Sequence, residues 1–275
     1  MAPSQAQDRY SLPRLLGWTR ASYYLLSAFL LTVFLIVYVW WPLAEELLSY
    51  IDWQGPWWLY MDWLLLGIFA VMSLLIMSGA DLRHDALIVL VGLGGGLVIE
   101  AWGTQTNLWV YYTNERPPLW IIPAWPIASL AIDRITRGLS RLLPASGGGY
   151  RAAYWLVFPL FYALMLSFVA PTLDKSFTWA ACLLTAVFIL TPTDHRAALL
   201  AFIAGSALGY YLELWGTTRQ CWTYYSLQTP PLFAVLAHGM AAVAFWRAGM
   251  LLVALAGFAR RRLRWRIAAR TVAPR

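Results

Sequence analysis

Two glutamates occupy equivalent places in a motif that the sequence carries twice, and they are its strongest candidates for acid–base chemistry. The motif reads E-x-W-G-T-x4-W-x-Y-Y-x4-P-P-L and starts at Glu100 and again at Glu213. Both glutamates fall in apolar segments, where a carboxylate is costly and usually faces a protein interior or a cavity. Two such groups close together can share one proton, which keeps one of them a neutral acid at pH 7. In the alternative reading, each glutamate only hydrogen-bonds the loop backbone or its threonine and holds the motif together.

His238 is the third candidate catalytic residue, because it stands where the first copy of the motif region has Trp125. A single histidine in a membrane helix is often a packed, hydrogen-bonding residue. Duplicated units, however, specialise by losing symmetry at a functional site. Both readings of His238 stay open.

Aromatic residues of the motif are the candidates for lining a substrate pocket. An aromatic belt at the headgroup layer is the alternative, but a belt needs neither fixed spacing nor a glutamate. We expect Gly103 and Gly216 to break their helices, and the proline pairs after the loops to start the next helices. Asp62 either faces the same cavity or is an interfacial acid. The candidate substrate-binding residues are Trp102, Trp109, Tyr111, Tyr112, Trp215, Trp222, Tyr224, Tyr225 and Asp62.

The elements that position these residues are predicted to be membrane helices. Of the 275 residues, 61% are hydrophobic and 12% are charged, against roughly 25% charged in soluble domains. About 20 apolar residues span a bilayer, and eight segments come near this length. They are Ser22–Trp41, Trp57–Ser78, Ala86–Gly103, Pro118–Asp133, Ala152–Ala170, Phe177–Thr191, Ala197–Gly216 and Pro231–Leu255.

The distribution of arginine and lysine predicts eight crossings with both termini in the cytoplasm, in a membrane of the bacterial inner-membrane type. On this topology the external loops hold only Arg116, Lys175 and Arg219. The cytoplasmic segments hold Arg9, Arg14, Arg20, Arg83, Arg134, Arg137, Arg141, Arg151, Arg196 and the tail from Arg260 to Arg275. The basic tail from Arg260 is then an orientation signal and a contact for anionic lipid. Despite the net charge of +7, nucleic acid is not an expected partner.

The repeat predicts an all-α membrane protein built as two parallel four-helix units. Residues 99–133 align without a gap on residues 212–246, and parallel repeats are related by an axis along the membrane normal. The expected divisions are an N-terminal segment 1–21, a first unit 22–140, a linker 141–151, a second unit 152–256 and a tail 257–275. Small residues on the third and seventh helices predict that these two helices form the central contact between the units. Asp81 and Asp194 are expected to cap them.

The motif resembles the membrane proteins of carotenoid biosynthesis, namely the carotenoid hydratases and the small-subunit lycopene cyclases. The residues that carry the resemblance are the membrane glutamate, the glycine-to-tyrosine loop, Pro118-Leu119-Trp120 and Trp125. Pro42, Glu45 and Glu46 are similar to the P-x-E-E signature of the cyclases, with one more residue between proline and glutamate. The resemblance implies an all-helical enzyme whose acidic residues protonate a polyene.

These observations together predict a membrane enzyme of the lyase or isomerase type that acts on an isoprenoid, a carotenoid or another lipid near the outer face. An acid would protonate an alkene, and aromatic faces would stabilise the carbocation. A transporter or lipid-binding protein and an assembly subunit with a membrane-protein partner are the alternatives. No cofactor or metal is expected, since no such spacing is present, and Cys182 and Cys221 are not expected to pair.

Overall fold

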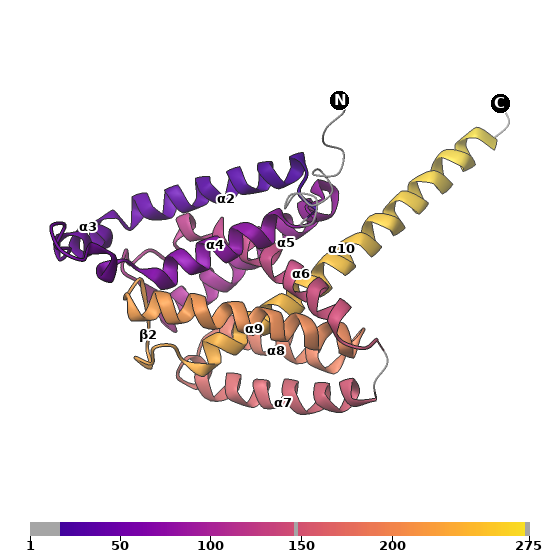
Figure 1. Cartoon of the computed structure of the whole chain (residues 1–275). Helices are drawn as coiled ribbons and strands as arrows, with labels where there is room; N and C mark the ends of the chain where they lie inside the picture. Colours follow the sequence, from indigo (N-terminus) through magenta and orange to yellow (C-terminus); the bar gives the residue numbers. More distant parts are fainter. Residues whose placement is uncertain (1–16, 146–147, 273–275) are drawn as a thin grey trace, which may run out of the picture.

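The computed structural model of the chain describes residues 17–145 and 148–272, with side chains as far as Arg262. Within these ranges the fold is helical apart from two short strands (Figure 1). Arg9, Arg14 and linker residues 146–147 lie outside the described residues. The helices are α2 (Arg20–Val39), α3 (Trp41–Ser49), α4 (Trp63–Met77), α5 (Leu82–Gln105), α6 (Ala124–Leu142), α7 (Gly149–Val169), α8 (Ser176–Leu190), α9 (His195–Thr218) and α10 (Leu232–Val272).

Five of these helical stretches are long and apolar enough to cross a membrane, as expected for a helical membrane protein. Two further helices, α4 and α8, are apolar but shorter. α10 continues far beyond the other helices toward the C-terminus (Figure 1). The five long stretches are Arg20–Val39, Leu82–Gln105, Gly149–Thr172, His195–Thr218 and Leu232–Arg262.

Aspartates begin three of the helices, as their preference for the N-cap position requires. The side chain of Asp81 accepts a hydrogen bond from the backbone N–H of Arg83 at the start of α5, and Asp194 accepts one from Ala197 at the start of α9. The capping role predicted for these two residues is therefore confirmed. Asp62 caps α4 in the same way, through the N–H of Leu65.

The helices that carry the two glutamates do not form the central contact between the halves, and that prediction is wrong. Within the described chain, α5 packs mainly on α6, and α9 packs mainly on α10. The halves meet where α6 lies on α9 and α10 lies on α5. Within each half, Gly96 makes room for the side chain of Trp125, and Gly209 makes room for that of His238, whereas Gly95 of α5 makes room for Phe245 of α10 in the other half.

Glycine does not break α5 or α9 within the motif, which corrects a second expectation. Both helices continue past Gly103 and Gly216, to Gln105 and Thr218. A Cβ atom at either glycine would overlap the indole of the motif's second tryptophan, Trp109 or Trp222. The glycines therefore let an aromatic ring lie directly on the helix backbone.

The ends of α5 and α9 share one backbone conformation. The N–H of Leu108 donates to the carbonyl of Gly103 over 2.9 Å, and that of Cys221 donates to Gly216 over 2.9 Å. The residues just before, Asn107 and Gln220, have φ angles of 59° and 56°. This is the Schellman arrangement, in which a left-handed residue ends a helix, and it turns the chain back over the helix end.

The returning loops meet as strands β1 (Trp109–Tyr111) and β2 (Trp222–Tyr224), which pair antiparallel. Val110 lies opposite Thr223, its aligned counterpart, and Trp109 lies opposite Tyr224. After the loops, Leu232 begins α10 directly behind Pro231, as expected. In the first copy, Pro118 precedes only a short 3-10 helix (Leu119–Ile121), and α6 starts at Ala124.

Candidate functional site

Glu100 is buried and receives three side-chain hydrogen bonds from its own half of the chain. Its Oε2 accepts from the indole N–H of Trp109 at 3.0 Å. Its Oε1 accepts from the hydroxyl of Tyr111 at 2.9 Å and from the indole N–H of Trp125 at 3.1 Å. An indole nitrogen can only donate a hydrogen bond. The carboxyl group of Glu100 is therefore the acceptor in both of its bonds with tryptophan. The aromatic residues of the motif are thus tied to their glutamate.

Glu213 repeats two of these three bonds. Its Oε2 accepts from Trp222 Nε1 at 2.9 Å, and its Oε1 accepts from the hydroxyl of Tyr224 at 2.8 Å. The third neighbour is His238, whose Nδ1 lies 3.7 Å from Oε1, beyond hydrogen-bonding distance. Glu213 therefore has one donor fewer than Glu100 and an ionisable neighbour in the place of Trp125.

The imidazole of His238 is fixed by a backbone carbonyl. Its Nδ1 lies 2.9 Å from the carbonyl oxygen of Ala234. Because a carbonyl can only accept, Nδ1 carries a hydrogen, and in the neutral ring Nε2 keeps a free lone pair. Within the described part of the chain, no residue hydrogen-bonds Nε2. His238 can therefore take up a proton at Nε2 while its orientation is held from the other side of the ring.

Both glutamates and His238 line one cavity of about 900 Å³ between the two halves. Its walls are otherwise mostly apolar and come from α2 and α4–α10. Six of the aromatic residues predicted from the motif also line it. They are Trp102, Trp109, Tyr111, Trp215, Trp222 and Tyr224. The structure thus brings the candidate acids, the histidine and most of the candidate aromatic residues together around one space.

The remaining three candidates lie outside the cavity lining and connect elements instead. The hydroxyl of Tyr112 donates to the carbonyl of Val39 at the end of α2. Tyr225 does the same for Phe168 near the end of α7, at 2.6 Å. Asp62 accepts from Trp215 Nε1 at 2.8 Å and from Arg219 Nε at 3.0 Å.

The two carboxyl groups do not bind each other in the described structure. Each is held by the aromatic side chains of its own half, so the arrangement does not support a shared proton between them. The expectation that the glutamates bond the loop backbone or a threonine is also not what is found. The hydroxyls of Thr104 and Thr217 bond the backbone carbonyls of Glu100 and Glu213, while the carboxyl groups bond tryptophan and tyrosine.

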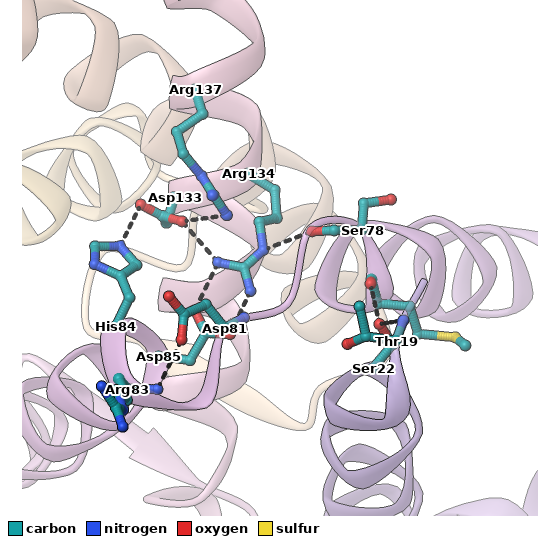
Figure 2. Close-up of polar contacts among 11 residues, drawn as sticks. Thr19, Ser22, Ser78, Asp81, Arg83, His84, Asp85, Asp133, Arg134 and Arg137 are labelled. Carbon is teal, nitrogen blue, oxygen red and sulfur yellow. Dashed lines mark hydrogen bonds and ion pairs between the residues drawn. The ribbon is translucent and has the colours of Figure 1, made fainter. Parts of the chain in front are cut away.

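A second polar cluster lies at the start of α5, and it was not predicted (Figure 2). Arg134 of α6 is 6% exposed and Asp85 of α5 is 1% exposed. The guanidinium binds both oxygens of Asp85, at 2.9 and 2.7 Å, and Asp133 at 2.7 Å. Its Nε donates to the carbonyl of Ser78 after α4. This buried ion pair therefore ties α4, α5 and α6 together.

His84 completes a group with Asp85 and Asp133 whose candidate ligand atoms lie within 4.8 Å of one another. Both carboxylates already bind the guanidinium of Arg134, which supplies the positive charge at this place. The cluster is best understood as an ion-pair network between helices.

Arg247 of α10 is the aligned counterpart of Arg134, and it also anchors a neighbouring helix end. It donates to the carbonyl of Phe188 at 2.7 Å and to Thr191 Oγ1 at 3.0 Å, at the end of α8. Asp85, however, corresponds to Ala198, so Arg247 has no equivalent carboxylate. Arg134 and Arg247 occupy aligned positions one residue beyond the block 99–133. This repeated arginine is the sequence feature from which both residues could have been found.

Comparison with known proteins yields no relative. No family model, no curated protein and no solved structure matches the chain. Any account of function therefore rests on the cavity and the residues that line it.

Proposed function

We propose that the protein is an integral membrane enzyme that binds a lipid in the central cavity and acts on it by acid–base chemistry at Glu213 and His238. We propose further that eight helices, α2 and α4–α10, cross the membrane as two parallel units. We assign Glu100 a structural role, because all three side chains around its carboxyl group donate hydrogen bonds to it.

The strand pairing supports the arrangement in two units. A twofold axis between two copies makes residue i of one copy contact residue j of the other, and j contact i. Trp109 lies opposite Tyr224, and Tyr111 lies opposite Trp222, which are the same two motif positions exchanged. α5 packs on α6 in one unit, and α9 packs on α10 in the other.

The observation that carries the proposal is the difference between the two carboxyl groups. Both glutamates accept hydrogen bonds on both oxygens, and the third side chain at Glu100 is an indole that cannot take up a proton. At Glu213 that position is held by His238, which can. An acid beside a second proton carrier in an apolar, aromatic-lined cavity is the arrangement that general acid catalysis on a lipid requires.

Glu213 and His238 can supply and remove the proton that the protonation of an alkene requires. The π electrons of the double bond take the proton of the Glu213 carboxyl group, which leaves a carbocation and a carboxylate. The faces of the lining indole and phenol rings stabilise the cation. Loss of a proton from the neighbouring carbon to Glu213 or to His238 Nε2 then gives an isomerised or cyclised alkene. Addition of water followed by loss of a proton gives a hydrated product instead.

Isoprenoids and carotenoids are the substrate class that this chemistry and the motif resemblance favour. The polar residues of the lining favour an enzyme over a transporter. The carboxyl and imidazole groups of the lining, from Glu100, Glu213 and His238, lie close together. A route for a polar solute needs polar groups along its length, and elsewhere the lining offers few beyond Thr32, Gln105 and Thr185.

The Glu213→Gln variant tests the proposal. Lipid extracts of cells that express wild-type protein, Glu213→Gln or no protein would be compared by mass spectrometry, with membrane amounts matched by immunoblot. We expect a lipid product that requires the wild-type protein and is absent with Glu213→Gln. Identical extracts from cells with wild-type protein and cells with none would contradict an enzymatic role.

A further inference from the structure

The exposed lining residues of the cavity lie on a few of its helices, and they show where a ligand can enter. Lining residues that are more than half exposed lie on three helices: Leu90 and Val98 on α5, Phe177 and Leu184 on α8, and Leu251 on α10. The lining residues of α2 and α4 are buried or half-buried. The opening therefore lies between α5, α8 and α10, and we call it the portal groove. Its exposed walls are apolar and would face lipid.

Small residues give the portal groove its width. Four alanines of α10 line it at helical spacing, Ala237, Ala241, Ala244 and Ala248. On the opposite wall, a Cβ atom added to Gly94 of α5 would meet nothing within 4 Å. The space in front of Gly94 is thus open.

The groove is long. Thirteen residues of α10 separate His238 from Leu251, and both line it. At 1.5 Å per residue this is about 20 Å, which exceeds the roughly 15 Å that one half of the hydrocarbon core provides. A single extended chain matches this form better than a compact solute does.

The charge at the far end of the groove favours an anionic head group. Phe188 lines the groove, and Arg247 donates to its carbonyl while the guanidinium lies 5.1 Å from the centroid of its ring. In the other half, Asp85 and Asp133 neutralise Arg134. Arg247 has no carboxylate partner among the described residues, and two hydrogen bonds leave three of its five donors for a ligand.

We propose that the portal groove binds a single-chain lipid with an anionic head group. The head group lies at Arg247, the chain runs between Gly94 and the alanines of α10, and the far part of the chain reaches Glu213 and His238. This inference rests on the proposed function, because it names the class of lipid that the catalytic site would receive. A fatty-acid carboxylate and an isoprenoid phosphate share the required chemistry.

Photo-crosslinking of the purified protein tests the groove. Three probes would be used: diazirine-bearing palmitate, the corresponding diazirine-bearing hexadecanol, and benzophenone-bearing geranylgeranyl phosphate. We expect at least one anionic probe to label peptides of α5, α8 and α10, and its identity tells which head group is bound. Labelling confined to other helices would overturn the proposal.

Two variants separate the chain from the head group. Gly94→Leu fills part of the groove, so labelling by every probe should fall about tenfold, the factor that corresponds to about 1.4 kcal/mol or roughly two buried methylene groups. Gly67→Leu on α4 is the matched control, because its Cβ also meets nothing within 4 Å and it lies outside the lining. Arg247→Gln should lower labelling by the anionic probes about tenfold and leave labelling by hexadecanol unchanged. A merely structural role of Arg247 would lower all three alike, and this outcome would overturn the assignment of the head group.

The Glu213→Gln variant distinguishes this proposal from the function on which it rests. Crosslinking in the groove should persist in Glu213→Gln, because the probe is held by the chain and the head group. Suppose that Gly94→Leu loses labelling, and that cells with Glu213→Gln give the same lipid extract as cells with wild-type protein. The groove is then supported and the catalytic proposal is contradicted. If Gly94→Leu labels as strongly as Gly67→Leu, the groove fails whatever the extracts show.

Discussion

Trp125 and His238 stack on each other across the cavity, with their ring planes 8° apart and their centroids separated by 5.9 Å. Each ring is the third neighbour of a different buried glutamate, Glu100 for Trp125 and Glu213 for His238. Positions 125 and 238 are the aligned pair at which the side chains around the two carboxyl groups differ. The contact between these two rings thus connects the two glutamate sites. The exchange of a tryptophan for a histidine changes the chemistry of one site while both keep the same frame.

The His238→Trp variant should convert the second site into a copy of the first. A tryptophan there has room, since Gly209 faces position 238 as Gly96 faces Trp125. Its indole would donate the missing hydrogen bond to Glu213, a gain of about 1 kcal/mol. We expect a higher midpoint of thermal unfolding in detergent and loss of the lipid product. Retention of the product would remove His238 from the mechanism.

The Gly103→Ala and Gly216→Ala variants should destabilise the fold, because the added Cβ atom would overlap the ring of Trp109 or Trp222. Overpacking of this kind costs about 1–3 kcal/mol. Gly138→Ala on α6 is the control, since its Cβ meets nothing within 4 Å, and alanine there should stabilise the helix by about 1 kcal/mol. Thermal unfolding followed by tryptophan fluorescence would show whether the three variants move in these directions.

The Asp85→Asn variant should be strongly destabilised, because it leaves the charge of buried Arg134 poorly compensated. Breaking a buried ion pair from one side costs about 3–5 kcal/mol. The double variant Asp85→Leu with Arg134→Met removes both charges and should recover most of the loss. The amount of folded protein after size-exclusion chromatography would measure both effects, and a double variant no better than the single one would show that the pair is not the source of the loss.

The thiol of Cys221 should resist alkylation in the folded protein. It lies in the loop after α9, where burial raises the pKa of the thiol to about 12, with Asp62 adding to the shift and Arg219 opposing it. At pH 8 the group is then almost entirely protonated, whereas a thiol with a pKa near 8.5 is partly ionised. Labelling by N-ethylmaleimide should be on the order of a thousandfold slower than for an exposed cysteine.

Exposed Thr223 provides that control, as Thr223→Cys in a Cys221→Ser background. Equal labelling rates at positions 221 and 223 would show that Cys221 is accessible. Denaturation should make the rate at Cys221 equal to that of the control.

The pairing of β1 and β2 can be tested with a disulfide. Val110 lies opposite Thr223, and directly opposed residues in a ladder come close enough for a bridge. The double variant Val110→Cys and Thr223→Cys, with both native cysteines replaced by serine, should oxidise to a crosslink between the halves. Cleavage at a protease site inserted at residues 145–149 would then release two fragments only after reduction. Shifting one cysteine to position 225 should abolish the crosslink.

Local sequence features predict much of the fold because they act within single elements. Apolar runs locate the positions of α2 and α4–α10, and aspartates mark the starts of α5 and α9. α6 differs from the expected segment because Pro118 is followed only by a 3-10 helix and the α-helix starts after Pro123, its N-cap residue. The spacing of small residues along a helix identifies one face of that helix but does not identify the helix that packs on it. The predicted contact of α5 with α9 was therefore wrong.

The site shows the same limit. The spacing of the motif identifies Glu100 and Glu213, and the broken symmetry identifies His238. The sequence does not reveal that Trp109 and Trp222 lie on glycines, because that contact depends on the Schellman turn after each helix. Arg134 was missed because it falls just beyond the expected segment Pro118–Asp133, where a basic residue resembles an ordinary topogenic charge until its buried partners are known. Arg247 falls inside the expected segment Pro231–Leu255, and its partners on α8 are far away in the sequence.

The exchanged pairing of β1 with β2 has a consequence for the origin of the chain. On the proposed duplication, a protein encoded by one unit would pair its single strand with that of a second molecule, in a self-complementary interface. Such a homodimer would hold two identical glutamates and two identical third neighbours. Only duplication of the gene would allow the third neighbours to become different, so the asymmetry between Trp125 and His238 would date from after the duplication.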